Sequence, residues 1–252
     1  TLRIFDLLKQ TGLWEVYERH VQQVDRVFAI MTHAGMPVDP AIRLEKATQL
    51  TQMLGEVDAE IQIVVPREVC PHHPKEGYKK LKPPDPTDPQ WTLLSNGLWA
   101  KRLPFIPSSG HHGGLVRYQD FLGQTPVRVD GKRTGDEAAI HRLRLRYPED
   151  KLYPLMQRRQ EIVKLGGTYT GWVKDGVIAG GLRVGSDQRI HTTYTHNPST
   201  LRTSSVSPNL QQIPRSNGLG QMVKEFFVAP PGYLLGEVDY AGIEALLVGH
   251  FA

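Results

Sequence analysis

The sequence predicts an α+β fold in which a run of helices is followed by short antiparallel strands. Two observations support this prediction. Apolar residues recur at helical spacing early in the chain, and the dipeptide Asp175-Gly176 within residues 172–184 is typical of a tight hairpin turn. The apolar positions of the first helical stretch are Val21, Val24, Phe28 and Met31.

Capping residues mark where the first long helix ends and the second begins. Gly35 suits a helix C-cap and Pro37 prevents continuation, whereas Asp39 followed by Pro40 is typical of a helix N-terminus. We therefore expect two consecutive helices joined by a tight turn. The apolar stripe of the second helix is Leu44, Ala47, Leu50, Leu54 and Val57.

Residues 66–104 interrupt this pattern and are interpreted as an insertion. The segment is rich in Pro, Lys and Asp and has no sustained periodicity, which is uncommon inside a compact domain. Apolar residues from Trp91 to Trp99 surround Asn96-Gly97, so a short hairpin is expected within it.

The chain after the insertion predicts three more helices and a strand. The first helix covers residues 115–122. Thr134-Gly135-Asp136-Glu137 has the form of a capping box and predicts a second helix, which Pro148 stops. The third covers residues 152–165 and is ended by two glycines, and residues 189–194 are typical of a strand.

Composition limits the classes of protein to consider. Lysine and arginine number 30 against 26 aspartate and glutamate, and the net charge of +4 permits nucleic-acid binding without requiring it. Cys70 is the only cysteine, which excludes an intrachain disulfide and suits a reducing cytosol. No apolar run reaches the roughly 20 residues that cross a bilayer, so no membrane partner is expected.

A zinc site is a weak interpretation of the cysteine and the paired histidines. Structural zinc needs four ligands, usually with two or more cysteines, and one cysteine beside adjacent histidines fits that set poorly. The candidate ligands would be Cys70, His72, His73, His111 and His112.

Two later segments carry the strongest indication of chemistry. Residues 234–238 suit a buried strand that would place Asp239 at the mouth of a sheet, within reach of a metal ion, and a helix is expected from Gly242. The alternative is an ordinary junction with Asp239 as helix N-cap. Residues 200–214 are dense in hydroxyl and amide side chains, which suits an ordered loop along a polar ligand, or simply a polar surface loop.

Together these segments resemble the family A DNA polymerases. Residues 200–214 resemble the pattern T-G-R-[LT]-S-S-x-x-P-N-L-Q-N-I-P, and residues 239–244 resemble D-Y-S-Q-I-E. The resemblance implies a helical thumb subdomain plus part of an antiparallel-sheet palm, an incomplete polymerase right hand. It assigns residues 1–12 to the end of an exonuclease-domain helix or linker, 13–172 to the thumb and palm-base helices, and 173–252 to the N-terminal half of the palm.

The resemblance implies a metal-dependent nucleotidyl transfer with two Mg²⁺ ions. Asp239 would bridge the metals and the Tyr240 carbonyl would add a ligand. Glu244 would be the gate that leaves no room for a ribose 2′-hydroxyl; the alternative is a helix-surface acid. Three residues depart from the family, which puts details of the nucleotide pocket in doubt: Ala241, Gly242 and Leu246.

The resemblance also implies contacts with primer–template DNA. Arg202 would read the minor groove at the primer terminus, where every base pair shows acceptors. Lys164 equally suits the C-terminal dipole of its helix. The implied DNA-contacting residues are Lys132, Arg133, Lys164, Thr168, Tyr169, Arg202, Ser204, Ser205, Asn209, Gln211 and Gln212.

Two family patterns do not occur in the sequence: the Lys-x-x-x-Phe-Gly-x-x-Tyr helix that binds the incoming deoxynucleoside triphosphate, and the His-Asp-Glu turn with the second metal-bridging aspartate. We therefore expect a fragment that needs a C-terminal palm and fingers segment and is inactive alone, from a cytoplasmic enzyme of a bacterium or phage-infected cell. Two alternatives are a non-catalytic half of a split polymerase and the palm of a phage-type single-subunit RNA polymerase, against which Glu244 argues.

Overall fold

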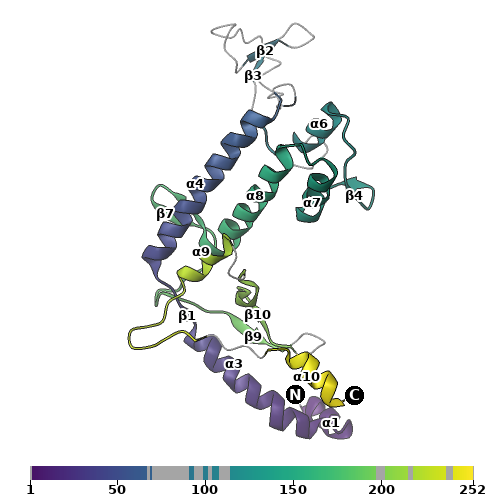
Figure 1. Ribbon diagram of the computed structural model, residues 1–252. Coiled ribbons are helices and arrows are strands. Elements are labelled where there is room, and N and C mark those ends of the chain that lie inside the picture. The colour runs from purple at the N-terminus through teal and green to yellow at the C-terminus, as the bar shows by residue number, and fades with distance from the viewer. Residues whose placement is uncertain are drawn as a thin grey trace. The chain divides into compact units, whose positions relative to one another are not determined.

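The computed structural model describes residues 2–66, 69, 91–93, 99–101, 104–107, 114–196, 202–214, 218–236 and 241–251. The chain forms two compact units, the first made of Thr1–Lys46 with Leu182–Ala252 and the second of Ala47–Gly181. Helices and small antiparallel strand pairs build both units, which confirms the α+β class (Figure 1). Among the described residues, no helix is long and apolar enough to traverse a bilayer.

The N-terminal part of the first unit is helical, as its apolar spacing predicted. Gly35, with a φ of 63°, ends the last of these helices, and the Asp39 carboxylate accepts hydrogen bonds from the Ala41 and Ile42 amides at 2.8 and 3.0 Å. Both predicted caps are therefore confirmed. The elements are α1 (Leu2–Gln10), α2 (Trp14–Val16), the π-helical turn η1 (Tyr17–Val21), α3 (Gln22–Ala34) and the start of α4 (Pro40–Val64).

The strands of the first unit form two separate antiparallel pairs. β1 (Met36–Pro37) pairs with β8 (Arg189–Ile190), and β9 (Thr193–Thr195) pairs with β10 (Ser204–Val206). The single strand predicted over residues 189–194 was wrong, because β8 and β9 have different partners. Between them the His191 side chain turns toward α3, where it bonds to the Thr32 carbonyl.

The C-terminal part of the first unit contains the 3₁₀ turn η4 (Leu210–Gln212), α9 (Gly220–Glu225) and α10 (Ile243–Phe251). Helix α10 confirms the helix expected from Gly242. The strand predicted over residues 234–238 was wrong in its described part: residues 234–236 are not a strand and Leu234 is 97% exposed. A strand needs a neighbour for its hydrogen bonds, and no described segment pairs with these residues.

The second unit packs its helices around a core of fully buried aliphatic residues. Leu50, Val57 and Ile61 of α4 are buried, as are Ile140 and Ile162. The Asp58–Arg159 ion pair at 2.6 Å joins α4 to α8. After α4 the elements are β2 (Trp91–Leu93), β3 (Trp99–Lys101), α6 (Gly114–Phe121), β4 (Arg128–Val129), β5 (Lys132–Arg133), α7 (Glu137–Arg146), α8 (Leu152–Leu165), the π-helical turn η3 (Gly166–Thr170), β6 (Trp172–Lys174) and β7 (Val177–Ala179).

The hairpin predictions in the second unit are confirmed, whereas the capping box is not. Asp175 and Gly176 have φ values of 51° and 78° between β6 and β7, as a two-residue hairpin turn requires. β2 pairs with β3, although Asn96-Gly97 lies outside the described residues. The N-cap of α7 is Asp136 rather than Thr134: the Asp136 carboxylate accepts from the Ala139 amide at 2.8 Å, so the helix begins two residues later.

Candidate nucleic-acid interface

A two-stranded ribbon, β9 with β10, positions the polar segment that the sequence singled out. The ribbon is anchored on α3 through aromatic contacts: the Phe28 ring lies 6.0 Å from that of Tyr194 and 5.9 Å from that of His196. The Tyr194 amide also donates to the Thr32 hydroxyl at 3.4 Å. The ribbon is therefore fixed on α3, and its second strand, β10, is part of the candidate interface.

The amide loop, defined here as residues 202–214, presents polar side chains on its surface. Arg202, Asn209, Gln211 and Gln212 are exposed, and Ser204 is half-buried. Asn209 also begins η4, because its side-chain oxygen accepts from the Gln211 amide at 3.1 Å. The Gln211 side chain is oriented by a 3.0 Å bond from its amide nitrogen to the Thr203 hydroxyl.

Ser205 lies on the inside of the amide loop instead of its surface. The residue has no exposed area, and its hydroxyl is bonded within the loop. The direct phosphate contact expected for Ser205 does not fit this position. Alternation along β10 explains the difference, because successive side chains of a strand point to opposite faces and Ser204 takes the outer one.

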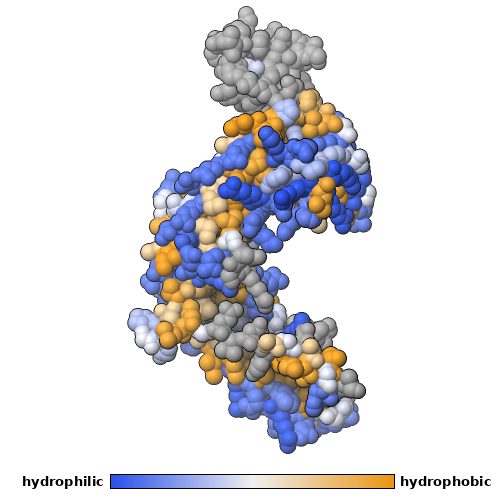
Figure 2. All heavy atoms as spheres, in the orientation of Figure 1, coloured by the Kyte–Doolittle hydropathy of each residue, from blue (hydrophilic) through white to orange (hydrophobic). Residues whose placement is uncertain are grey.

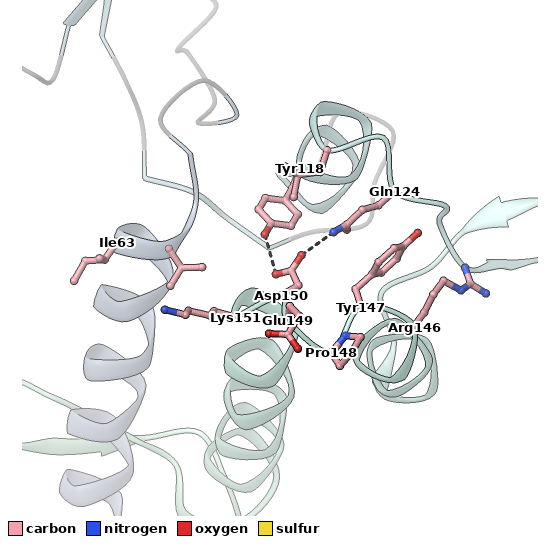
Figure 3. A pocket seen from close by; sticks show the side chains of 11 residues that line it. Ile63, Tyr118, Gln124, Arg146, Tyr147, Pro148, Glu149, Asp150 and Lys151 are labelled. Atoms are coloured by element: carbon pink, nitrogen blue, oxygen red, sulfur yellow. Dashed lines mark hydrogen bonds between the residues drawn. The ribbon is translucent and has the colours of Figure 1, made fainter.

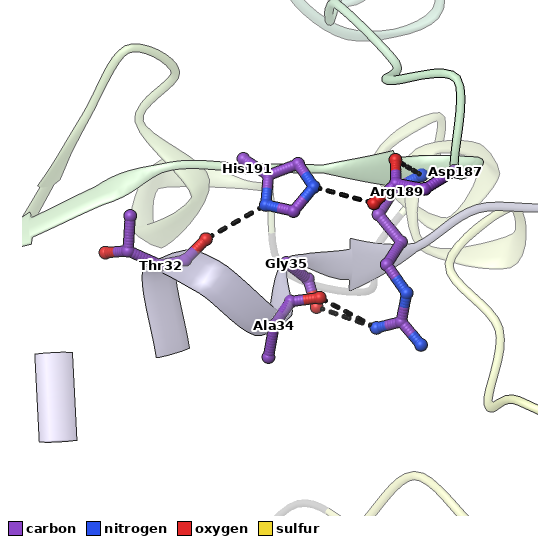
Figure 4. A network of polar contacts seen from close by, with 6 residues as sticks. All are labelled: Thr32, Ala34, Gly35, Asp187, Arg189 and His191. Atoms are coloured by element: carbon purple, nitrogen blue, oxygen red, sulfur yellow. Dashed lines mark hydrogen bonds and ion pairs between the residues drawn. The ribbon is translucent and has the colours of Figure 1, made fainter. Parts of the chain in front are cut away.

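A cationic network ties the base of the ribbon to the C-terminus of α3 (Figure 4). The His191 ring nitrogens lie 2.9 Å from the Thr32 carbonyl and 2.9 Å from the Asp187 carboxylate. Arg189 donates to the Ala34 and Gly35 carbonyls at 2.8 and 3.3 Å. Helix C-termini favour positive charge, so both side chains complement α3.

The environment of His191 raises its pKa, first through the Thr32 carbonyl and then through Asp187. The same contact with His191 lowers the pKa of the Asp187 carboxyl. Gly35 makes the arrangement possible: a Cβ there would lie 2.7 Å from the His191 ring. A side chain at Gly35 would therefore displace the imidazole.

The predicted catalytic residues are covered only in part. Asp239 and Tyr240 lie outside the described residues. Glu244 lies in α10, one residue after its start. Gly242 precedes this helix with a φ of 67°, and its carbonyl accepts from the Leu246 amide at 3.0 Å. The departure from the family glutamine at this position thus coincides with a backbone conformation that favours glycine.

Apolar side chains cover much of the surface of α10 (Figure 2). Leu246 and Val248 are each 69% exposed, and Leu247 is half exposed. Helix α10 therefore combines the predicted acidic gate with an exposed apolar surface. Such a surface indicates that the helix packs against further residues. The described residues contain no group of three or more His, Cys, Asp or Glu side chains that could hold an ion. The weak zinc candidates, Cys70 to His112, all lie outside the described residues.

The residues of the second unit that were predicted to contact DNA differ in how exposed they are and in whether they already have a partner. Lys132 and Thr168 are exposed, and Lys164 is exposed beside Glu137 at 3.4 Å. Arg133 instead forms a 2.7 Å ion pair with Asp120. Tyr169 is buried in η3, and this burial raises its pKa. Its ring therefore packs inside the unit, whereas the prediction placed it on the surface, in contact with DNA.

A cavity of about 750 Å³ in the second unit is lined by none of the predicted site residues (Figure 3). Three of its polar side chains form one network: Tyr118 and Gln124 donate to the Asp150 carboxylate at 2.8 and 2.7 Å, and Asp150 also accepts from the Leu152 amide at 2.9 Å. Burial and Asp150 raise the pKa of Tyr118. This network fixes the turn between α7 and α8.

Sequence reasoning missed Thr192, which lies between β8 and β9. Its side chain is buried, and its hydroxyl lies 2.6 Å from the Pro208 carbonyl and 3.1 Å from that of Val206. No local signal could identify it, because these partners are 16 and 14 residues away in the sequence.

Comparison with known proteins identifies the class of this fold and interface. The model of DNA polymerase family A matches residues 122–252, which is more than half of the chain. The match includes the amide loop, the Asp239 segment and α10. The chain belongs to DNA polymerase family A.

Individual relatives agree with this assignment. DNA polymerase I of Rhizobium leguminosarum is 33% identical over 257 residues, covering 100% of this chain and 21% of that protein. The thermostable DNA polymerase I of Thermus filiformis is 36% identical over 137 residues, covering 53% of this chain and 15% of that protein. The chain thus spans a small part of the relatives it matches.

A solved structure shares the fold. It is described as the POL domain of Pol1 from M. smegmatis in complex with DNA primer–template and dNTP. The two structures superpose with a TM-score of 0.51 at 20% sequence identity, over 91% of this chain and 33% of the other. At this identity the likeness concerns the fold alone.

Proposed function

We propose that this chain is part of a DNA-directed DNA polymerase that adds deoxynucleotides to a primer 3′ end. The family match over residues 122–252 carries the proposal, because it includes both segments in which the sequence placed chemistry. The exposed amides of the amide loop support it further. Side chains of this type donate to the groove acceptors that every base pair presents, so they can bind DNA without reading its sequence.

In this proposal the helical second unit contributes to the thumb and the ribbon belongs to the palm. Arg202, Asn209, Gln211 and Gln212 contact primer–template, and Lys132 and Lys164 contact phosphates. Primer–template and dNTP are the partners in the description of the M. smegmatis structure, and we transfer both to this chain. The enzyme would work in the cytoplasm of a bacterium or phage-infected cell.

The proposed chemistry depends on Asp239. Its carboxylate and the Tyr240 carbonyl are oxygen donors, the type that Mg²⁺ prefers. When bound, two Mg²⁺ ions would lower the pKa of the primer hydroxyl and neutralise charge on pyrophosphate. Asp239 and Tyr240 suit such ions in kind but not in number, so the site needs further carboxylates.

The proposed role of Glu244 is steric. As a gate beside the sugar of the incoming nucleotide, its side chain would occupy the space of a ribose 2′-hydroxyl. A separate polypeptide segment would bind the triphosphate and provide the second metal-bridging aspartate. The 252-residue chain by itself should then bind DNA without extending a primer.

Primer extension tests the proposal directly. The full-length protein that contains this chain should extend a labelled primer with dNTPs and Mg²⁺, and the 252-residue chain should not. Failure of the full-length protein to extend any primer would contradict the proposal. Extension with ribonucleotides alone would instead indicate an RNA polymerase.

A further inference from the structure

Ser205 makes the contacts of a structural hub. Its hydroxyl accepts from the Leu210 amide at 2.9 Å and from the Gln211 amide at 3.2 Å, and it donates to the Asn209 side-chain oxygen at 3.1 Å. A serine hydroxyl has one hydrogen and two lone pairs, so these three bonds use its full capacity. The residue has no exposed surface. Its hydroxyl therefore holds the amide loop from inside.

Thr192 holds the same loop from the neighbouring segment. Its hydroxyl hydrogen is shared between the Pro208 and Val206 carbonyls, at 2.6 and 3.1 Å, and the residue is only 3% exposed. The two buried hydroxyls thus bind opposite ends of residues 206–211. Between them they bond four backbone groups of this segment, the Val206 and Pro208 carbonyls and the Leu210 and Gln211 amides.

The amide side chains that these hydroxyls support are exposed, although the Asn209 side-chain oxygen bonds inward to Ser205. Asn209, Gln211 and Gln212 are exposed, although the backbone amide of Gln211 is bonded to Ser205 on the inside. The orientation of η4 therefore depends on Ser205 and Thr192. A loop already fixed in its binding shape loses less entropy when its ligand binds.

We propose that Ser205 and Thr192 are positioning residues, which hold η4 so that the amides of Asn209, Gln211 and Gln212 face primer–template DNA. This inference rests on the proposed function. The inference differs from the proposed function in assigning Ser205 an indirect role, and in adding Thr192, which is buried.

The first experiment removes each hydroxyl in the full-length protein and measures affinity for a fluorescent primer–template by anisotropy. Ser205→Ala and Thr192→Val should each weaken binding about tenfold, because the loop backbone loses the hydrogen bonds that fix the orientation of η4. Thr193→Val is the matched control, since it makes the same change at the exposed neighbour of Thr192. The control should bind as wild type does. Wild-type affinity in both hydroxyl variants would overturn the inference.

A second experiment separates positioning from general loss of structure. Thr192→Ser keeps the hydroxyl and should restore wild-type affinity. The effect of Ser205→Ala should become much smaller in a Gln211→Ala/Gln212→Ala background, because two of the three amides that it positions are absent. An equal loss in both backgrounds would show that Ser205 only stabilises the fold and would overturn the inference. If Ser205→Ala does not fold, Thr192→Val compared with Thr192→Ser decides the question.

The same assays distinguish this inference from the proposed function. A wild-type protein that neither binds primer–template nor extends it would refute the proposed function. An active wild-type protein with fully active Ser205→Ala and Thr192→Val variants would refute only the positioning roles. At saturating DNA the variants should keep near-wild-type kcat and show a raised KM for primer–template.

Discussion

The amide loop and the C-terminal segment, residues 233–251, differ in how well their side chains find partners within the segment. The amide loop bonds its buried polar groups internally, through Ser205 and Asn209. The C-terminal segment instead exposes its apolar groups: Leu234 is 97% exposed and Leu246 69% exposed. Both regions contain sequence motifs of the same family. They differ in the kind of contact that each needs. A hydrogen-bonded turn can close within a dozen residues, whereas a buried strand and an apolar helix need neighbours.

The largest expected effect compares a buried and an exposed aliphatic residue of the first unit. Ile190→Ala should lower the free energy of unfolding by about 2–5 kcal/mol, because Ile190 is fully buried in the β1–β8 pair. Leu234→Ala should change it by less than about 0.5 kcal/mol. Urea denaturation of the 252-residue chain measures both. Comparable losses would mean that residues 233–236 are packed in solution and would break the comparison.

The outcome of sequence prediction follows the same division. Local signals placed the Asp39 cap, the Gly35 stop and the Asp175-Gly176 hairpin correctly, because each depends on neighbouring residues. The single strand at residues 189–194 was wrong because β8 pairs with the distant β1, whereas β9 pairs with β10.

In the interface, residue type was predictable and orientation was not. The sequence identified the amide loop, and Arg202, Asn209, Gln211 and Gln212 are exposed. It did not show that Ser205 faces inward, because strand alternation there depends on the start of β10. Thr192 could not be found at all, since its partners are distant in sequence.

The next effect concerns sugar discrimination by Glu244 in the full-length protein. Truncation to alanine removes a proposed clash, so Glu244→Ala should raise the efficiency ratio of ribonucleotide to deoxynucleotide incorporation about 10- to 100-fold. Single-nucleotide incorporation kinetics measure the ratio. Glu161→Ala, an exposed acid on α8, is the control. An unchanged ratio in Glu244→Ala would make Glu244 a helix-surface acid.

A smaller effect tests whether exposure predicts phosphate contact in the second unit. Lys132→Ala should reduce the slope of log affinity for DNA against log salt by about 0.9, the value for one phosphate contact. Lys174→Ala, an exposed lysine on β6, should leave the slope unchanged. Arg133→Ala should mainly lower stability, because Arg133 is paired with Asp120. Equal slopes for Lys132→Ala and wild type would remove Lys132 from the interface.

The smallest expected effect is the pH dependence at the base of the ribbon. The pKa of His191 is raised, so its stabilising contribution is complete below its ordinary value of 6.5 and disappears as pH rises through the raised value. The pKa of Asp187 is lowered, so its contribution is complete above 3.8 and disappears as pH falls through the lowered value. The pair therefore stabilises the ribbon most between these ordinary values.

Urea denaturation at pH 5.5 and pH 8.5 tests this pair. The loss of stability between the two pH values should be larger in wild type than in His191→Gln. An NMR titration of the His191 ring should give a pKa above that of a histidine in an unfolded chain. Identical pH dependence in wild type and His191→Gln would contradict the assignment.

The central claim is that this chain supplies the catalytic carboxylate of a DNA polymerase. Primer extension by the full-length protein with Asp239→Asn tests it most directly, with Asp175→Asn in the β6–β7 hairpin as the matched control. The account predicts that Asp239→Asn abolishes extension and keeps near-wild-type affinity for primer–template, because the carboxylate acts on metal ions and not on the duplex. Asp175→Asn should extend normally. Near-normal turnover by Asp239→Asn would contradict the account.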